Sequence, residues 1–395
     1  MPAPRNTFVE GDNLDVLAGL AEGSVDVAYL DPPYNRDTAL LYRDRSAVAR
    51  AGAADRHAAW VAMMRPRLAE VRRVLAPEGA VFVSIDDREV AHLRLLLDEV
   101  FGEAAFVAQV VVNLNAKGRQ LGGGFAVSHE YLLVYARDAR RCRLDPTSPD
   151  NVDPADFGHT AEDGRRYRLL PLRNTNKRFR PSTAPTLHYP LHGDPGTGRV
   201  SCVPFDGATE VHPVFGDGAP AVWRWSAPLV AQRSDDLVCR TVRGRLGERV
   251  DVFQRDWLTP ERRKKLTTIW LAEEIGSTDT AVAEVTALVG KAFDSPKPTG
   301  LLRRVVATYP ADARVLDPFA GSGTTGHAVA LLNAADGGTR TCLSINAGEP
   351  VRPGSAAAEA GFATVADVTR ARLRAVDATL GGGYAEGVGE GFRPR

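Results

Sequence analysis

The glycine-rich segment 317–326 (DPFAGSGTTG) constrains the fold more than any other part of this sequence. It follows a short apolar run and precedes a segment, 325–333, with the composition of a helix. Glycines let the backbone turn tightly and let a ligand approach the N-terminus of a helix. The spacing of Gly321, Gly323 and Gly326 fits the pattern of a dinucleotide-binding loop. The segment predicts a strand–loop–helix unit for a nucleotide-like cofactor, and by itself it also suits a nicotinamide-dependent dehydrogenase.

The acidic residue at the start of this segment narrows the choice of cofactor. Asp317 favours a ligand that carries an amine or a cation, because a carboxylate would repel a pyrophosphate. The strand expected after the glycine loop ends at Asn346, and Glu349 follows three residues later. We expect one of these two side chains to bind the ribose hydroxyls, and the pattern does not choose between them.

The hydrophobic pattern alternates between strands and helices outside the middle of the chain. The predicted strands are 7–10, 25–30, 80–85, 106–112, 131–136, 314–316 and 341–345, and the predicted helices are 13–21, 57–75, 88–101, 301–308 and 325–333. Alternation of this kind is typical of an α/β fold with a doubly wound, Rossmann-like sheet.

The composition changes in the middle of the chain, where Pro, Gly, Asp and Arg are frequent and the periodicity of apolar residues is weak. We therefore expect a loop-rich, mixed α/β insert between two halves of one domain, followed by a flexible glycine-rich tail. The predicted parts are 1–137, 138–265, 266–375 and 376–395.

A second motif, Asp31-Pro32-Pro33-Tyr34, follows the apolar run 25–30. The two prolines fix φ and remove two backbone donors, which holds the carbonyl groups in place. The Asp31 carboxylate beside such a carbonyl, with the Tyr34 ring above, predicts an acceptor-rich clamp for an amino group.

Together, LDPPYN (30–35) and DPFAGSGTT (317–325) resemble the amino DNA methyltransferases that use S-adenosylmethionine, in the permuted (beta) order with the catalytic motif first. Further segments resemble the modification subunit of type III restriction–modification systems: 84–109, 129–136, 267–278, 293–305 and 337–349. The resemblance covers about 1–137 and 266–349. It implies a circularly permuted methyltransferase sheet, with the insert as the target-recognition domain.

The resemblance also implies roles for the clamp. Asp31 and the carbonyl of Pro32 would accept hydrogen bonds from the exocyclic amino group of a base. Tyr34 would stack on that base after it leaves the duplex, because the amino group is otherwise paired. Pro33 completes the catalytic motif, and no metal is required.

On the cofactor side, the resemblance assigns the methionine end of S-adenosylmethionine to Asp317 and its adenine to Asp12. Lys297 and Pro298 would form the helix entrance that closes over the methionine carboxylate. The pocket lining would come from Phe319, Gly321, Ser322, Gly323, Thr324 and Thr325.

The net charge of zero, from 49 Lys+Arg and 49 Asp+Glu, argues against a nucleic-acid partner when it is read globally. The charge is unevenly distributed, however, since the insert 140–265 carries net +6 and the rest carries −6. We expect phosphate or guanine contacts from one run without acidic residues, namely Arg165, Arg166, Arg168, Arg173, Lys177, Arg178 and Arg180. A second basic cluster lies at 262–265, and for both a solvated charged loop is the alternative.

These observations predict a site-specific methyltransferase that forms N6-methyladenine in double-stranded DNA. Cytosine-N4 methylation by the same chemistry is the alternative, and a dehydrogenase or a non-catalytic DNA-binding subunit are the readings from other classes. By resemblance, a homodimer and a restriction subunit are candidate partners. The absence of a signal pattern and of a long apolar run predicts a cytoplasmic, nucleoid-associated protein without a membrane segment. The four scattered cysteines form neither a zinc framework nor a disulfide scaffold.

Overall fold

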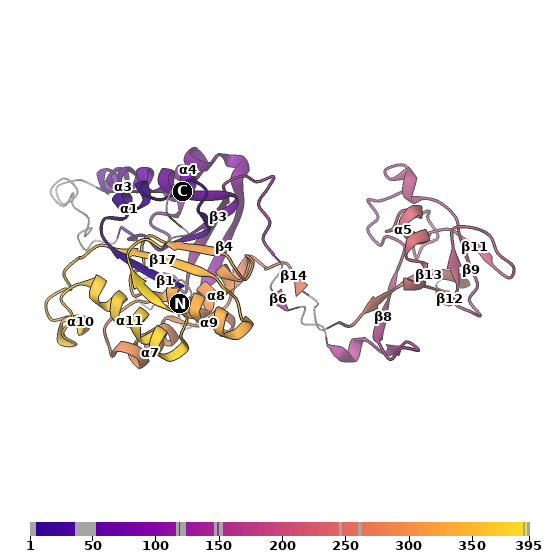
Figure 1. Cartoon of the computed structure of the whole chain (residues 1–395). Helices are drawn as coiled ribbons and strands as arrows, with labels where there is room; N and C mark the ends of the chain where they lie inside the picture. The colour runs from indigo at the N-terminus through magenta and orange to yellow at the C-terminus, as the bar shows by residue number, and fades with distance from the viewer. Residues whose placement is uncertain are drawn as a thin grey trace. The chain divides into compact units, whose positions relative to one another are not determined.

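The chain forms two units in the computed structural model, which describes residues 5–35, 53–115, 118, 124–145, 148–149, 153–244, 247–259, 263–389 and 392 (Figure 1). One unit comprises residues 1–148 and 265–395, and the other comprises 149–264. The predicted insert begins earlier, at residue 138. Residues 138–145 instead belong to the first unit, where Asp145 donates its backbone N–H to the carbonyl of Thr308 at 2.9 Å.

A nine-stranded mixed sheet forms the centre of the first unit, in the order β15-β4-β5-β3-β2-β16-β17-β1-β18. In that order the strands are Ile269–Trp270, Phe106–Asn113, His129–Ala136, Leu75–Ile85, Val25–Leu30, Arg314–Asp317, Thr341–Asn346, Asn6–Glu10 and Tyr384–Glu386. β5 runs antiparallel to β3 and β4, and the other paired strands are parallel. β2 pairs directly with β16, so the two halves of the predicted domain share one sheet.

Helices cover both faces of this sheet (Figure 1). One face carries α1 (Asn13–Ala18), α3 (Ala53–Val74) and α4 (Val90–Phe101). The helices of the C-terminal half are α6 (Ala272–Ile275), α7 (Thr278–Val289), α8 (Thr299–Val306), α9 (Thr324–Asp336), α10 (Ala356–Glu359) and α11 (Val365–Leu380).

Successive residues of the central strands contribute to two different cores, one on each face of the sheet. In β3, Val81 and Val83 pack into the core beneath α3 and α4, whereas Phe82 packs into the core beneath α8 and α9. Strands buried on both faces read as continuous apolar runs, which is why the pattern predicted them well. The doubly wound α/β fold is confirmed.

The tail 376–395 was expected to be flexible, but part of it, 376–380 and 384–386, forms regular structure. α11 continues to Leu380, and β18 then pairs in parallel with β1, with Asn6 opposite Tyr384. Three glycines between them, at 381–383, all have positive φ, so the glycine run makes the turn that returns the chain to the sheet edge.

The second unit is mostly β structure with its own apolar core, which includes Trp223, Leu191 and Val252. An antiparallel sheet has the order β12-β13-β8-β7, and a smaller one has the order β10-β9-β11. The elements of this unit are β7 (His159–Thr160), β8 (Arg166–Pro171), β9 (Leu191–Gly193), β10 (Val200–Ser201), β11 (Thr209–Val211), α5 (Ala227–Gln232), β12 (Leu237–Gly244) and β13 (Gly247–Trp257). β6 (Ser148–Pro149) and β14 (Arg263–Lys264) form a separate two-stranded pair.

Among the described residues, no helix has both the length and the apolar character that crossing a bilayer requires.

Candidate active site

The two sequence motifs lie at the same edge of the sheet because they follow neighbouring parallel strands. β2 ends at Leu30, immediately before Asp31, and β16 ends at Asp317. Ligands of open α/β sheets bind outside the carboxyl ends of the strands. The topology therefore brings the predicted clamp and the predicted cofactor loop to one place.

Contacts with α3 hold the backbone of the clamp. Trp60, which is fully buried, donates its indole N–H to the carbonyl of Pro33 at 2.6 Å. Asn35 adopts a φ of 51°, a left-handed conformation that asparagine tolerates better than most residues. Its amide donates to the carbonyl of Arg56 at 3.3 Å. These bonds fix the backbone of the clamp, and with it the positions of the Asp31 carboxylate and the Tyr34 ring.

The Lys297 side chain lies inside the clamp rather than at the glycine loop. Its ammonium group donates to both carboxylate oxygens of Asp31 and to the hydroxyl of Tyr34, each at 2.9 Å. It also lies 4.9 Å from the centre of the Tyr34 ring and 3.4 Å from Glu130 Oε1. Only the backbone of Lys297 faces the cofactor loop, where its carbonyl accepts from the hydroxyl of Thr324 at 3.2 Å. The lysine therefore connects the two motifs.

Glu130, at the start of β5, is a member of this cluster that sequence reasoning missed. Its Oε2 accepts from the Tyr34 hydroxyl at 3.2 Å. Burial raises the pKa of Glu130, and the ammonium of Lys297 opposes that rise. For Lys297, burial alone would lower the pKa, but Asp31 and Glu130 bring it above the ordinary value. An acidic residue at the head of an otherwise apolar strand (HEYLLVYA) was the available signal.

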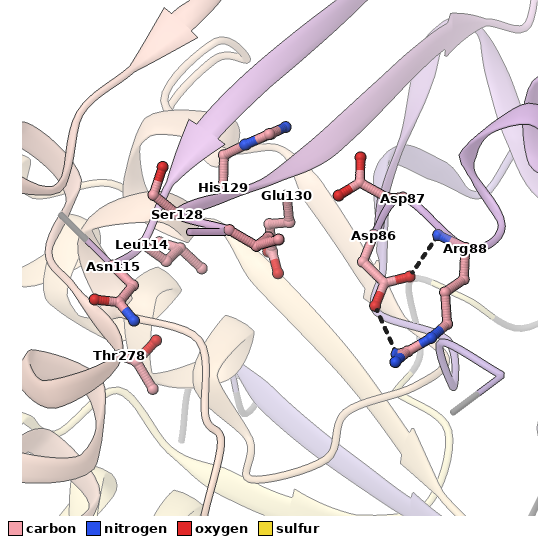
Figure 2. Close-up of a pocket in the computed structure, with 10 residues that line it drawn as sticks. Asp86, Asp87, Arg88, Leu114, Asn115, Ser128, His129, Glu130 and Thr278 are labelled. Carbon is pink, nitrogen blue, oxygen red and sulfur yellow. Dashed lines mark hydrogen bonds and ion pairs between the residues drawn. The ribbon is translucent and has the colours of Figure 1, made fainter. Parts of the chain in front are cut away.

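A pocket of about 370 Å³ opens beside the clamp, and Glu130 forms part of its wall (Figure 2). Polar lining side chains come from the ends of four elements: Asp86 after β3, Asn115 after β4, Ser128 before β5 and Thr278 at the start of α7. This volume lies within the range of about 300–1,000 Å³ that small-molecule sites occupy.

Asp317 is buried at the end of β16, with 2% of its surface exposed. Its carboxylate accepts from the backbone N–H of Phe319 at 3.1 Å and from the hydroxyl of Thr325 at 2.5 Å. Burial raises the pKa of Asp317 to about 7, although both hydrogen bonds lower it. Phe319 is itself 6% exposed and packs into the hydrophobic core. The carboxylate is thus held rigidly at the base of the loop.

The three glycines of the loop meet different steric demands. Gly321 and Gly323 have φ values of 50° and 78°, and Gly323 caps the N-terminus of α9. A Cβ atom on Gly326 would lie 2.6 Å from Leu373 Cδ2, so this glycine permits close packing of α9 against α11. The first two glycines therefore shape the turn, and the third sets the helix packing.

Arg372 on α11 is a second residue that sequence reasoning missed. Its fully buried guanidinium donates to the hydroxyls of Ser322 at 3.0 Å and Thr324 at 2.9 Å. Burial lowers the pKa of Arg372 to about 10. Ser322 and Thr324 were predicted to line the cofactor pocket with their backbone, and their side chains are engaged by this arginine.

The two candidates for the ribose differ in their surroundings. Asn346, at the end of β17, donates to the carbonyl of Gly321 at 3.2 Å and to the hydroxyl of Thr369 at 3.1 Å, so its amide nitrogen holds the glycine loop. Glu349 lies beyond the strand, where its carbonyl accepts from the N–H of Val365 at 2.8 Å.

Asp12, predicted to contact adenine, follows β1 at the same edge of the sheet. It caps α1 by accepting from the N–H of Leu14 at 2.9 Å, and it pairs with Arg67 at 3.2 Å. The neighbouring Asn13 donates to the carbonyl of Pro318 at 2.8 Å. The start of α1 is therefore tied directly to the cofactor loop.

The N-terminus of α8, where Pro298 is the cap, was expected to receive the methionine carboxylate. In the structure, the Glu284 carboxylate from α7 takes that position. It accepts from the backbone N–H of Thr299 at 2.9 Å and from its hydroxyl at 2.7 Å. An anion is thus bound at this helix end, which agrees with the positive end of the helix dipole.

The basic run of the second unit is more neutralised than the sequence indicates. Four of its seven side chains pair with carboxylates: Arg165 with Asp163 (2.6 Å), Arg168 with Asp256 (2.8 Å), Arg173 with Asp251 (3.5 Å) and Lys177 with Asp217 (2.7 Å). Strand pairing brings in acids that are distant in sequence, since Arg168 lies opposite Asp256 in the β8–β13 register. Arg166 and Arg180 donate to backbone carbonyls, and Arg178 is exposed. Of the second cluster, position 262 and the side chains of 263 and 264 lie outside the described residues.

The doubly wound sheet brings the Asp31–Tyr34 motif beside a glycine-rich loop at the carboxyl ends of its strands, which is where enzymes of this fold bind their ligands. Residues 25–345 match the family model of N6/N4 enzymes described as DNA methylase, and the chain belongs to this family.

Two relatives show how far the similarity extends. The chain is 32% identical over 373 residues to the type II methyltransferase M.KpnI of Klebsiella pneumoniae, covering 93% of this chain and 86% of that protein. It is 31% identical over 404 residues to the Mod subunit of the type III enzyme EcoPI of Escherichia phage P1, covering 94% and 62% respectively. The chain therefore spans less than two thirds of that Mod subunit. Among solved structures, the cytosine-N4-specific PvuII DNA methyltransferase aligns over 97% of both chains with 13% identity and a TM-score of 0.46.

The resemblance to amino DNA methyltransferases and type III modification subunits is thus confirmed. The protein is an enzyme that methylates DNA with S-adenosylmethionine, rather than a dehydrogenase or a non-catalytic DNA-binding subunit.

Proposed function

We propose that the enzyme methylates the N6 amino group of adenine in double-stranded DNA. Support comes from the sequence Asp31-Pro32-Pro33-Tyr34-Asn35 and from the similarity to type III Mod subunits, which favours adenine. Cytosine-N4 methylation remains the alternative, because both reactions use an exocyclic amino group conjugated to a base.

The Lys297 ammonium within the clamp is the observation that carries the methylation of an exocyclic amino group, whichever base bears it. It offers N–H donors to both oxygens of Asp31 and lies against the Tyr34 ring. A base amino group also presents N–H donors on a nitrogen attached to a flat ring. In the productive complex this amino group takes the place of the ammonium in front of Asp31, and Lys297 moves aside.

The clamp residues then prepare the nitrogen for attack. Asp31 and the Pro32 carbonyl accept hydrogen bonds from the two N–H groups of this amine. These bonds concentrate electron density on the nitrogen and orient its lone pair. Tyr34 stacks on the ring of the base, and Pro33 keeps the backbone rigid through its bond to Trp60. When bound, the cofactor would supply an electrophilic methyl group on its sulfonium sulfur, and the sulfur would leave as a neutral thioether when the carbon–sulfur bond breaks. The nitrogen loses a proton as the methyl group is transferred, and the Asp31 carboxylate is placed to accept it.

The glycine-loop edge suits the cofactor in charge. Asp317 suits an amine, and the left-handed turn at Gly321 and Gly323 carries the chain around the space at the strand ends. The methionine carboxylate would replace Glu284 at the start of α8, next to Pro298. We assign the adenine contact to Asp12.

The ribose contact falls to Glu349 or to the carbonyl oxygen of the Asn346 side chain. The amide nitrogen of Asn346 is already bonded to Gly321 and Thr369. Phe319, Ser322, Thr324 and Thr325 contribute mainly by shaping the loop backbone, since their side chains are buried.

The pocket beside Glu130 would receive the extruded base. It adjoins the clamp through Glu130, and its polar lining provides donors and acceptors for the edge of a purine. A base held there would lie on the Glu130 side of the clamp, next to the residue that accepts from the Tyr34 hydroxyl.

The second unit would recognise the target sequence. The best candidates for phosphate or base contacts are Arg166, Arg178 and Arg180, because no carboxylate pairs with them among the described residues. Arg165, Arg168, Arg173 and Lys177 would first have to exchange a carboxylate for DNA. A cognate restriction subunit and a second copy of the chain are further proposed partners, and action on chromosomal DNA implies a cytoplasmic, nucleoid-associated location.

A single variant tests the clamp, and product analysis tests the base. Asp31→Ala is expected to abolish methyl transfer from labelled S-adenosylmethionine to DNA while cofactor binding persists. Asp15→Asn, an exposed carboxylate on α1, is the matched control. Activity that survives in Asp31→Ala would contradict the clamp assignment. Nucleoside analysis of the product is expected to give N6-methyladenine, and N4-methylcytosine would overturn the choice of base.

A further inference from the structure

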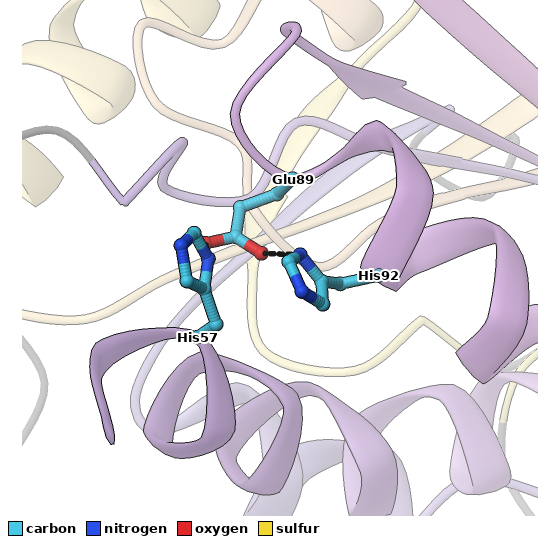
Figure 3. Close-up of side chains that lie close together, drawn as sticks. All are labelled: His57, Glu89 and His92. Atoms are coloured by element: carbon cyan, nitrogen blue, oxygen red, sulfur yellow. Dashed lines mark hydrogen bonds and ion pairs between the residues drawn. The ribbon is translucent and has the colours of Figure 1, made fainter. Parts of the chain in front are cut away.

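Two histidines and a glutamate meet between α3 and α4 (Figure 3). His57 comes from the first turns of α3, Glu89 caps the N-terminus of α4, and His92 follows one turn later. His57 Nδ1 lies 2.6 Å from Glu89 Oε1, and His92 Nδ1 lies 3.1 Å from Glu89 Oε2. One ligand atom from each residue can be chosen so that all three lie within 4.8 Å of one another.

The carboxylate of this cluster is completely buried, whereas both imidazoles are accessible. The exposed fraction of the side chain is 0% for Glu89, 37% for His57 and 41% for His92. A buried carboxylate needs a compensating positive charge. Among the described residues, its side-chain partners are these two histidines and the amide of Asn35, and none is a lysine or an arginine. The Glu89 carboxylate is therefore buried without a lysine or arginine partner among the described residues, and both neighbouring imidazoles reach solvent.

Two atoms of the cluster lack a hydrogen bond although they face each other. His92 Nδ1 and Glu89 Oε2 are buried, and neither has a hydrogen-bond partner within the described part of the chain. Their separation of 3.1 Å brings a carboxylate oxygen against a ring nitrogen without the geometry of a hydrogen bond. A ring nitrogen and a carboxylate oxygen without hydrogen-bond partners are atoms that a cation can bind.

We propose that His57, Glu89 and His92 bind one divalent transition-metal ion, with zinc as the expected member of the class. Two imidazole nitrogens and one carboxylate oxygen are a donor set that zinc uses, and they do not suit magnesium or calcium, which prefer oxygen ligands. Zinc lies about 2.0–2.1 Å from such nitrogens, so the two accessible rings must turn inward to close the site. Water completes the coordination.

The ion has a structural task that is separate from methyl transfer. The amide of Asn35 donates to Glu89 Oε1 at 2.5 Å, and Asn35 directly follows the Tyr34 of the clamp. A metal ion on Glu89 would fix α3, α4 and the end of the clamp loop to one another. The proposal does not depend on which base the enzyme methylates.

Metal analysis of the full-length protein tests the site. After incubation with Zn²⁺ and exhaustive dialysis, elemental analysis is expected to find one zinc ion per chain. His57→Gln and His92→Asn, made separately at partly exposed positions, are each expected to weaken zinc binding at least about 100-fold in calorimetric titration, beyond the 10–100-fold effect of removing a supporting contact. Zn²⁺ is also expected to raise the melting temperature of the wild type and not that of either variant.

His212→Gln in the second unit is the matched control, because His212 also contacts a histidine ring and a glutamate but is exposed together with that glutamate. It is expected to bind zinc like the wild type. Retention of one tightly bound zinc ion in both His57→Gln and His92→Asn would overturn the proposal, since the ion would then lie elsewhere. Failure of the wild type to bind Zn²⁺ at 100-fold molar excess would also overturn the proposal. The three residues would then form a hydrogen-bonded cluster without a metal ion.

Discussion

The buried carboxylate of Asp317 leads to an unusual expectation: its removal stabilises the protein while it impairs cofactor binding. Burial raises the pKa of Asp317 to about 7, against an ordinary value of 3.8. The folded chain therefore binds this proton more tightly than the unfolded chain does. The stabilisation from this group is complete below about pH 4 and is lost as the pH rises to about 7.

The magnitude follows from the two pKa values. Each pH unit between them removes about 1.4 kcal/mol, so the ionised carboxylate lowers the free energy of unfolding by about 4 kcal/mol above pH 7. Asp317→Asn cannot ionise, and its amide oxygen can still accept from the N–H of Phe319. Between pH 5 and pH 8, the stability of the variant relative to the wild type is expected to rise by about 3 kcal/mol.

Urea unfolding of both proteins at pH 5 and pH 8, without cofactor, measures this difference. Asp15→Asn removes an exposed carboxylate and is expected to keep a constant difference from the wild type. A relative stability of Asp317→Asn that changes by less than about 1 kcal/mol between the two pH values would refute the reasoning, because it would mean that Asp317 is not buried as an isolated carboxylate.

Three further outcomes follow from the same structure. If Asp317 binds the amine of S-adenosylmethionine, the cofactor affinity of the wild type should rise on the order of 30-fold from pH 5.5 to pH 8.5, whereas equilibrium binding to an Asp317→Asn variant should show no such rise. Lys297→Met removes the ammonium that opposes the raised pKa of Glu130, so the acid limb of the pH profile of kcat/KM should move to higher pH, and Lys297→Arg should restore it; an unchanged limb would argue against this electrostatic role. Gly300→Ala places a Cβ 2.8 Å from the backbone carbonyl carbon of Ile275 and should destabilise the protein by about 1–3 kcal/mol in urea, whereas Gly216→Ala, in open space, should be close to neutral.

Local patterns in the sequence were sufficient to predict the fold class and the two motifs. Strands buried on both faces appear as apolar runs, and the turns after β2 and β16 carry their own signatures in proline and glycine. The family resemblance rests on those same segments. The parallel pairing of β2 with β16 then explains why two motifs from opposite ends of the chain meet.

Tertiary pairing decided what each polar side chain does. Lys297 was expected at the cofactor, yet it reaches the clamp because Asp31 and Glu130 lie within its span. Arg372 engages the glycine loop only because α11 packs on α9.

Charge follows the same rule, because the charge counted along a segment differs from the charge left unpaired after the strands come together. The run 165–180 contains no acid, but antiparallel pairing places Asp256 opposite Arg168 and leaves fewer free cations than the sequence count suggests. Periodicity and turn chemistry are properties of neighbouring residues, so the sequence by itself determines the fold class, the clamp motif and the cofactor loop. Ion pairs, burial and perturbed pKa values depend on which elements come together, and only the tertiary structure decides them.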